Sequence, residues 1–356
     1  MMQSLWVKKN ELAQSQWHES GTPSLADGQI LLAVEKYALT ANNITYAVVG
    51  DGFGYWNFFP TGDAEWGIVP VWGFAKVVAS ENADIAVGER VYGYLPMASH
   101  LLVTPTHVQD GGFVDGAEHR QGLAIIYNQY NRLGTDEGAL EAERAIFQPL
   151  FTTSFLIEHF MRSNDWFGAE ALLMTSASSK TSLGLAMVAK SLSPSIRRIG
   201  LTSAGNKAFV EKSGLYDEVV TYDNLSAADA AMPTVSVDFA GSGQLLAAIH
   251  DHWSDKLKFS SLVGVTHIAE RGGADDLPGP KPELFFAPTA AEVLIKEIGP
   301  AAFRARVDEQ FSAFVTGASA YLKIENLEGR DALQSAYLSM LANEVEPSRG
   351  LMCHLA

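Results

Sequence analysis

The sequence predicts an α/β protein in which a β-rich N-terminal part precedes a doubly wound parallel sheet. An apolar run at 171–174 leads into a loop of small polar residues, and a helical pattern with a mostly apolar face follows from 183. Further apolar strands alternate with helical patterns after this loop, which is typical of a parallel sheet covered by helices. Before the loop, short strands recur at roughly ten-residue spacing with glycine turns, which indicates a small barrel or sandwich.

Composition and charge disfavour several classes of protein. The chain has 356 residues, of which 47% are hydrophobic and 19% charged, so we expect two or three domains with a sizeable core. The net charge of −16 disfavours nucleic acid and anionic membrane surfaces as partners, because both bind clustered Lys and Arg. We expect no membrane span, since no apolar stretch approaches about 18 residues. The single Cys353 allows no disulfide within the chain, and without a recognisable signal peptide we expect a cytoplasmic protein.

The N-terminal half is expected to hold strands with aromatic connections. Residues 1–26 are mixed, and 38–49 reads as a connecting segment. The segment 51–67 is rich in glycine and aromatic residues, so it either packs as a lid over the protein's own core or forms the wall of a substrate cleft. The expected strands are 28–37, a pair at 69–80, one within 86–96 after a glycine turn, and 100–105.

The C-terminal half is expected to alternate strands and helices. After the strand at 171–174, the later strands are expected at 196–203, 218–222, 235–241, 259–265 and 284–287, with two more at 320–325 and 349–352. The expected helices are 151–160, 183–190, 206–214, 290–314 and 331–342. The region from 123 to 147 is expected to be partly helical.

The loop after 171–174 is a candidate phosphate site. A helix start offers unpaired N–H groups and a partial positive charge, both of which suit a phosphate. Serines stand where a dinucleotide loop usually has glycines at three-residue spacing, and their hydroxyls can donate to phosphate oxygens. The alternative is a polar loop without a ligand. The candidate cofactor-binding residues here are Ser176, Ser178, Ser179, Lys180, Thr181 and Ser182.

Two further features bear on the nucleotide. The triplet 179–181 resembles the end of a Walker A loop, but both glycines of that motif are missing, which disfavours a nucleoside triphosphatase. No carboxylate ends the second strand, where an acidic residue binds the ribose of NAD, so we expect NADP(H) as the cofactor. Lys207 is either a 2′-phosphate ligand or an ordinary surface lysine. The candidates after the second and third strands are Thr202, Ser203, Asn206, Lys207 and Tyr222.

Several motifs together resemble the medium-chain dehydrogenase/reductase superfamily, nearest to its zinc-free quinone oxidoreductases. Residues 87–93 are similar to the family's turn in a GroES-like barrel, 177–190 to its cofactor loop and helix, and Gly350-Leu351 to its closing strand. The resemblance implies a GroES-like catalytic domain over 1–130 and 318–356. It also implies a Rossmann dinucleotide-binding domain over 131–317 and assembly as a homodimer.

The zinc ligands of that superfamily are missing from the corresponding positions. The early barrel strand reads Val71-Trp72-Gly73-Phe74, and the four-cysteine lobe of zinc-dependent members is absent. His250 and His252 have the spacing of a metal pair but no evident third ligand, so we interpret them as an exposed helical pair. We therefore expect no metal site.

The resemblance also implies where the substrate is polarised. Tyr46 and Thr45 replace the metal-site region and are the first candidates for that role, and Asn43 is a second donor. Tyr46 has the alternative role of a core phenol. The expected function is a zinc-independent, NADP(H)-dependent oxidoreductase that transfers hydride to or from a small quinone, enone or carbonyl substrate. The alternative is an inactive nucleotide-binding sensor or scaffold with a dehydrogenase fold.

Overall fold

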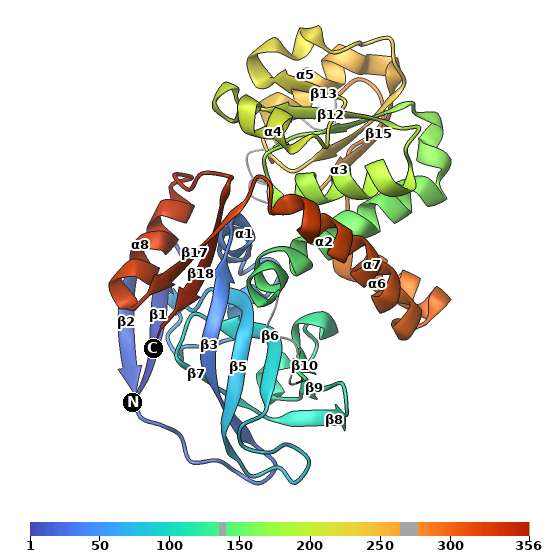
Figure 1. Cartoon of the computed structure of the whole chain (residues 1–356). Coiled ribbons are helices and arrows are strands. Elements are labelled where there is room, and N and C mark those ends of the chain that lie inside the picture. Colours follow the sequence, from blue (N-terminus) through green and yellow to red (C-terminus); the bar gives the residue numbers. More distant parts are fainter. Residues whose placement is uncertain (135–139, 264–276, 356) are drawn as a thin grey trace. The chain divides into compact units, whose positions relative to one another are not determined.

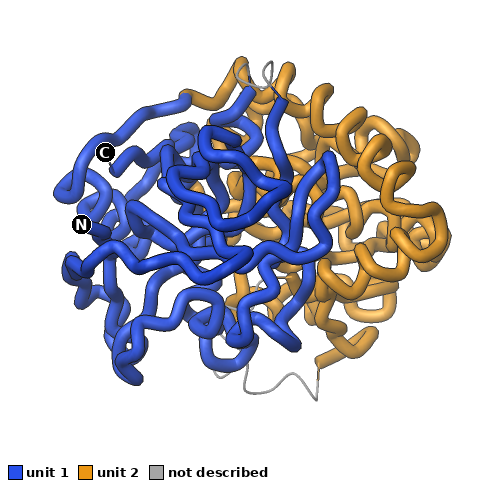
Figure 2. Tube along the Cα trace, turned by 90° about the horizontal axis from the view of Figure 1, so that it is seen from below, with its two compact units in different colours: residues 1–146, 324–356 blue, residues 147–323 orange. Residues whose placement is uncertain are grey.

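The chain forms two compact units, which are described separately. The computed structural model describes residues 1–134, 140–263 and 277–355. Unit 1 comprises Met1–Ile146 and Ile324–Ala356, and unit 2 comprises Phe147–Lys323 (Figures 1 and 2). The domain boundaries expected from the sequence, 1–130 with 318–356 and 131–317, remain a prediction about which parts fold independently.

Unit 1 is built around antiparallel strands. Its larger sheet has the order β17-β18-β3-β5-β6-β10-β9-β8, with β7 paired to β3, and a smaller sheet has the order β2-β1-β4. The strands are β1 (Met2–Lys8), β2 (Glu11–Ser20), β3 (Ile30–Leu39), β4 (Trp66–Gly67), β5 (Pro70–Ser80), β6 (Arg90–Pro96), β7 (His100–Val103), β8 (Pro105–Gln109), β9 (Gly112–Asp115), β10 (Gln129–Arg132), β17 (Lys323–Glu328) and β18 (Arg349–His354). The expected β-rich N-terminal part is confirmed.

Two N-terminal predictions were wrong, and one hairpin was not predicted. Residues 1–26, which are mixed in sequence, contain the antiparallel hairpin β1–β2, whose second strand is mostly polar and has no buried residue. The segment 69–80 is the single strand β5 rather than a strand pair. The connecting segment 38–49 contains the helix α1 (Ala41–Val48), which begins after the N-cap Thr40. The helix α8 (Arg330–Leu341) of this unit lies where a helix was expected.

The aromatic segment 51–67 packs into the core of unit 1. Four of its rings are buried, and a short 3-10 helix, η1 (Tyr55–Asn57), carries two of them. A Cβ atom at Gly50 or Gly67 would lie 2.2 or 2.4 Å from the Trp56 ring, so these glycines leave room for the indole. The interpretation as a lid over the protein's own core therefore holds for the buried rings, which are Tyr55, Trp56, Phe58 and Phe59.

Unit 2 is a parallel sheet with the strand order β13-β12-β11-β14-β15-β16. Its strands are β11 (Ala171–Met174), β12 (Arg197–Thr202), β13 (Glu218–Thr221), β14 (Thr234–Asp238), β15 (Leu257–Leu262) and β16 (Glu283–Leu284). Numbered in chain order, this is 3-2-1-4-5-6, the order of a dinucleotide-binding sheet. The predicted Rossmann-type α/β unit is confirmed.

Helices accompany the sheet of unit 2 (Figure 1). They are α2 (Glu141–Ser163), whose residues up to Ile146 belong to unit 1, α3 (Lys180–Leu192), α4 (Lys207–Ser213), α5 (Gly243–Trp253), α6 (Ala287–Ile298) and α7 (Pro300–Ala318). Where one helix was expected at 290–314, Gly299 separates two, because its φ of +83° leaves the helical region and Pro300 begins α7. The predicted end of the fifth strand, 264–265, lies outside the described residues.

Side chains along the strands of unit 2 alternate between two apolar layers. Because successive side chains point to opposite faces, Leu172 and Met174 join one core cluster while Ala171 and Leu173 join another. Burial on both faces explains why these strands read as continuous apolar runs in the sequence. No helix within the described part of the chain combines the length and hydropathy needed to cross a bilayer.

Candidate functional site

The candidate site lies where the strand order of unit 2 reverses. From β11 the sheet continues through β12 on one side and through β14 on the other. In open parallel sheets, ligands bind outside the carboxyl ends of the strands at such a switch point. The residues that follow β11 and β14 are therefore the first to consider.

Thr175 and Asp238 join the ends of β11 and β14. The Thr175 hydroxyl donates to Asp238 Oδ1 at 2.7 Å and accepts the backbone N–H of Phe239 at 2.8 Å. The N–H of Gly241 donates to Asp238 Oδ2 at 3.2 Å. Both side chains are buried, so this network fixes the edge of the switch point. Sequence reasoning missed both residues, although a carboxylate that ends a buried apolar strand is the signal that would have found Asp238.

Serine side chains shape the loop that connects β11 to α3. Ser176 has a φ of 45°, in the left-handed region that glycine adopts more easily, and its N–H donates to the Tyr222 phenol at 3.2 Å. Ser179 is the N-cap of α3, and its hydroxyl accepts the N–H of Ser182 at 3.2 Å. The predicted residues Ser176 and Tyr222 are thus brought together.

Two more contacts tie this loop to the chain that follows β12 and α4. Asn206 Nδ2 donates to Ser178 Oγ at 3.1 Å. The Ser182 hydroxyl lies 3.0 Å from the Tyr216 hydroxyl, which donates to the carbonyl of Ala177 at 2.8 Å. The structure therefore places the loop beside residues that follow β12, as a cofactor site spanning both segments requires.

Lys180 and Thr181 open α3. Burial lowers the pKa of Lys180 to about 8, because the ammonium is less well solvated there than in water. The Thr181 carbonyl accepts the Ser154 hydroxyl at 2.7 Å, which anchors this turn to α2. A lysine at the first position of a helix adds positive charge where the backbone already presents N–H groups.

The end of β12 holds a buried hydroxyl without a partner. Thr202 is 1% exposed, and its Oγ1 has no hydrogen bond to a described residue. It shares a face of the strand with Gly200, whose missing Cβ would contact Tyr216 and Ala177, so Thr202 faces the same side as the loop. Ser203 is half-buried beyond it. Lys207 forms an ion pair with Glu211 on α4.

The predicted catalytic residue Tyr46 lies in an aromatic cluster of unit 1. Its ring centroid is 4.6 Å from that of Tyr55 and 5.4 Å from that of Tyr94, and its hydroxyl accepts the Trp72 N–H at 3.2 Å. Burial raises the pKa of Tyr46 well above its ordinary value, and Tyr55 adds to the rise. The phenol therefore stays protonated at neutral pH.

Asn43 and Thr45 lie on α1 with Tyr46. Both ends of the Asn43 amide are used, since Oδ1 accepts the Thr40 N–H at 2.7 Å and Nδ2 donates to the Pro70 carbonyl at 2.9 Å. The Thr45 hydroxyl turns back toward the Ala41 carbonyl at 3.4 Å. This arrangement favours a structural role for Asn43, and the catalytic roles of all three residues remain predictions.

The interpretation of His250 and His252 as an exposed pair was wrong. His250 is fully buried, with Nδ1 2.8 Å from the Pro278 carbonyl and Nε2 2.9 Å from Ser260 Oγ. His252 Nε2 is 2.9 Å from the Ala228 carbonyl. Both imidazoles serve as structural hydrogen-bonding groups, because α5 packs against the sheet on this side. The described residues contain no group of three or more His, Cys, Asp or Glu placed to hold a metal ion.

Comparison with known proteins agrees with this architecture. A model of the family described as "Protein of unknown function (DUF2855)" matches residues 37–346. No curated protein sequence matches the chain. Solved structures match it over their full length at low identity, which shows the fold alone.

Three of these structures illustrate the likeness. CurA from Vibrio vulnificus in complex with NADPH has 13% identity and a TM-score of 0.63, with 99% of each chain covered. S. aureus TarJ in complex with NADPH has 10% identity and a TM-score of 0.60, with 100% of each chain covered. The quinone oxidoreductase from Coxiella burnetii has 12% identity and a TM-score of 0.57, covering 100% of this chain and 99% of that one. The fold is that of the medium-chain dehydrogenase/reductase superfamily.

Proposed function

We propose that this chain, which belongs to the family described as "Protein of unknown function (DUF2855)", is a zinc-independent oxidoreductase that uses NADP(H). The proposed reaction transfers hydride to or from a small quinone, enone or carbonyl substrate. The observation that carries the proposal is the polar loop at 176–182, which lies at the switch point of a sheet with the strand order 3-2-1-4-5-6. The NADPH complexes of CurA and TarJ, which share this fold, support the choice of cofactor.

The residues present fit a phosphorylated dinucleotide. NADPH, when bound, supplies the hydride, and the chain has to hold its phosphates and orient it. The N–H groups at the start of α3 and the ammonium of Lys180 suit the pyrophosphate. The hydroxyl of Thr202, which has no hydrogen-bond partner among the described residues, lies at the strand end that leads to Ser203 and Asn206, and no residue from 202 to 207 is acidic. This set suits a 2′-phosphate better than a free ribose.

In this proposal, Tyr46 donates a proton to the substrate oxygen. The Trp72 N–H donates to the phenol oxygen, and the side chains of Asn42 and Tyr127 also interact with this hydroxyl. Because burial keeps Tyr46 protonated, it can act as an acid at neutral pH but not as a base. Thr45 is the second candidate for polarising the substrate.

A second function is favoured by the internal hydrogen bonds of the loop. The hydroxyls of Ser178, Ser179 and Ser182 are already engaged with Asn206, a backbone N–H and Tyr216. A loop that satisfies its own polar groups gains less from a phosphate than a glycine loop with open N–H groups. This observation favours a nucleotide-binding sensor or scaffold without turnover.

Calorimetric titration of the purified chain with NADPH and, separately, NADH tests the cofactor. We expect NADPH to bind at least about tenfold more tightly. Lys207→Met should weaken the binding of NADPH but not that of NADH. Lys212→Met, at the other end of the same helix, should change neither affinity. Equal effects of the two substitutions would identify Lys207 as an ordinary surface lysine, and no binding of either nucleotide would remove the oxidoreductase proposal.

A hydride-transfer assay separates the two functions. NADPH oxidation is followed by absorbance with a panel of quinones, enones and aldehydes. Turnover of any of these substrates supports the oxidoreductase. Tight NADPH binding without turnover across the panel supports the sensor or scaffold instead.

A further inference from the structure

A pocket lies in unit 2, away from the nucleotide loop. It has a volume of about 250 Å³ and is lined by residues of α2, α3 and α7, namely Phe155, His159, Arg162, Leu192, Arg306, Glu309 and Gln310. Leu192 is the last residue of α3, whereas the loop lies at its first residue. At a rise of about 1.5 Å per residue, these two ends are about 18 Å apart. The pocket is therefore separate from the proposed cofactor site.

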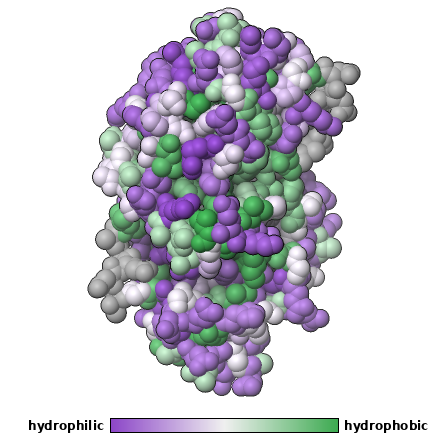
Figure 3. Space-filling view, turned by 90° about the vertical axis from the view of Figure 1, so that its right-hand side faces the viewer, coloured by the Kyte–Doolittle hydropathy of each residue, from purple (hydrophilic) through white to green (hydrophobic). Residues whose placement is uncertain are grey.

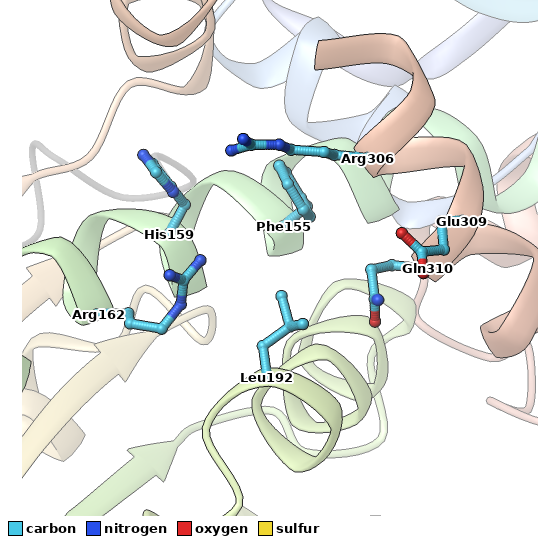
Figure 4. A pocket seen from close by; sticks show the side chains of 7 residues that line it. All are labelled: Phe155, His159, Arg162, Leu192, Arg306, Glu309 and Gln310. Atoms are coloured by element: carbon cyan, nitrogen blue, oxygen red, sulfur yellow. The ribbon is translucent and has the colours of Figure 1, made fainter. Parts of the chain in front are cut away.

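One side of the pocket is basic. Figure 4 shows the side chains of His159, Arg162 and Arg306 directed to the same side. Arg162 Nε lies 2.9 Å from the fully buried carboxylate of Glu158, so its charge is balanced. Burial, with help from Arg162, lowers the pKa of His159 and keeps its imidazole neutral at pH 7. Arg306 has no ion-pair partner among the described residues, so its charge is available to a ligand.

The other side of the pocket accepts hydrogen bonds. Figure 4 shows Glu309 and Gln310 on this side, opposite the basic one. Gln310 Oε1 is buried and has no hydrogen-bond partner within the described part of the chain. A buried acceptor without a donor costs free energy, which a ligand with an N–H group would recover. Phe155 and Leu192 lie between the two sides and make the middle of the pocket apolar.

We propose that this pocket binds a small zwitterion whose anionic and cationic ends are separated by a short apolar chain, as in a linear ω-amino acid. The ligand carboxylate pairs with Arg306, its ammonium meets Glu309 and Gln310 Oε1, and its methylene chain packs between Phe155 and Leu192. The charges of Arg306 and Glu309 balance, which disfavours a purely anionic or cationic ligand. The volume lies below the ~300–1,000 Å³ typical of drug-sized ligands, so the ligand is small.

Calorimetric titration of the full chain with three probes of equal chain length tests the charge pattern. The probes are 6-aminohexanoate, hexanoate, which lacks the ammonium, and hexylamine, which lacks the carboxylate. We expect 6-aminohexanoate to bind at least about tenfold more tightly than either of the others. Equal or tighter binding of hexanoate or hexylamine overturns the proposal, and so does the absence of binding by 6-aminohexanoate. The titration contains no nucleotide, so its result is independent of the oxidoreductase proposal.

Matched substitutions locate the binding. Arg306→Gln and Glu309→Gln should each weaken the binding of 6-aminohexanoate by about tenfold or more. Arg304→Gln, an exposed position on the same helix outside the pocket, should leave the affinity unchanged. By NMR, bound 6-aminohexanoate should also raise the pKa of His159, since a carboxylate stabilises the imidazolium. Equal affinity in the Arg306 and Arg304 variants, or an unchanged His159 titration, would place the binding elsewhere.

Discussion

The Ser179 hydroxyl pairs with a backbone N–H at the start of α3. A glycine at the same position would leave that N–H to a ligand or to water. The N–H belongs to Ser182 and is one of the donors that a helix start leaves unpaired. Ser179→Ala should lower the free energy of unfolding by about 1 kcal/mol, because the N-cap is lost. Urea denaturation measures the change, with Ser226→Ala, at an exposed position in the same unit, as the control. Equal stability of the two variants would show that the cap contributes little.

The lowered pKa of Lys180 predicts how nucleotide affinity depends on pH. Burial lowers this pKa to about 8, and a bound phosphate favours the protonated form. Above pH 8 the lysine must take up a proton when the phosphate binds. NADPH affinity should therefore fall as the pH rises through 8, by up to about tenfold per pH unit. Stability of the unliganded chain should rise over the same range, because the unfolded state binds more protons there.

Calorimetry with NADPH between pH 6.5 and 9.5 measures this dependence. Lys180→Met should weaken binding at pH 7 and flatten the profile. Lys190→Met, in the last turn of the same helix, should keep the wild-type profile. A profile that is unchanged in the Lys180 variant would assign the pH dependence to another group.

Tyr46 carries the proposed proton transfer. Tyr46→Phe keeps the ring tilted against that of Tyr55 but removes the hydroxyl that accepts the Trp72 N–H. Turnover should fall by about 10²- to 10⁴-fold, the usual contribution of general acid catalysis, while NADPH affinity stays unchanged. Steady-state kinetics with a substrate found in the panel measures the loss. Full activity of the variant would make Tyr46 a core phenol only.

At the scale of elements, the side-chain amide of Asn43 anchors the helix α1 to β5. Asn43 is 2% exposed and joins the Thr40 N–H at the start of α1 to the Pro70 carbonyl of β5. Asn43→Ala leaves both groups buried without their partner, which should cost about 1–3 kcal/mol in the free energy of unfolding. Thermal and urea denaturation measure it, with the exposed Asn57→Ala as the control. A loss of turnover without a loss of stability would instead support Asn43 as a substrate donor.

The elements of unit 2 could be predicted well and those at the edge of unit 1 could not. The strand β11 is buried on both faces and therefore reads as a plain apolar run. By contrast, no residue of β2 is buried, and its mostly polar sequence carries no clear apolar alternation. The helical pattern continues over 290–314, but the structure has two helices there. The helix ends at Gly299 and a new one begins at Pro300, because these two residues break the helical backbone.

At the scale of the whole molecule, the proposed homodimer is expected to involve the β16 edge of the sheet in unit 2. Among the described residues, β16 is the last strand of that sheet. Leu284 on β16 is 47% exposed, and Phe286 and Val293, which follow along the chain, are 37% and 64% exposed. Figure 3 shows hydrophobic and hydrophilic residues interspersed over one face of the molecule. Exposed apolar residues at a strand edge are typical of an interface.

Light scattering coupled to size-exclusion chromatography tests this assembly. Leu284→Lys should convert a dimer of the chain to a monomer, because a charge at the edge opposes pairing with a second strand. Val87→Lys changes an equally apolar residue of unit 1 that is 63% exposed, and it should leave the dimer intact. A wild-type chain that elutes as a monomer would remove the proposed dimer.

The sequence by itself determined the fold class and the position of the candidate cofactor loop. Apolar periodicity depends on which face of each strand or helix is buried, so it can be recognised from consecutive residues such as those of β11 and α3. Only the tertiary structure decided which polar groups meet. The pairing of Thr175 with Asp238, of Ser178 with Asn206 and of Ser176 with Tyr222 joins residues from different strand ends. The physical reason is that hydrogen bonds depend on distances between atoms, and the topology of the sheet sets those distances.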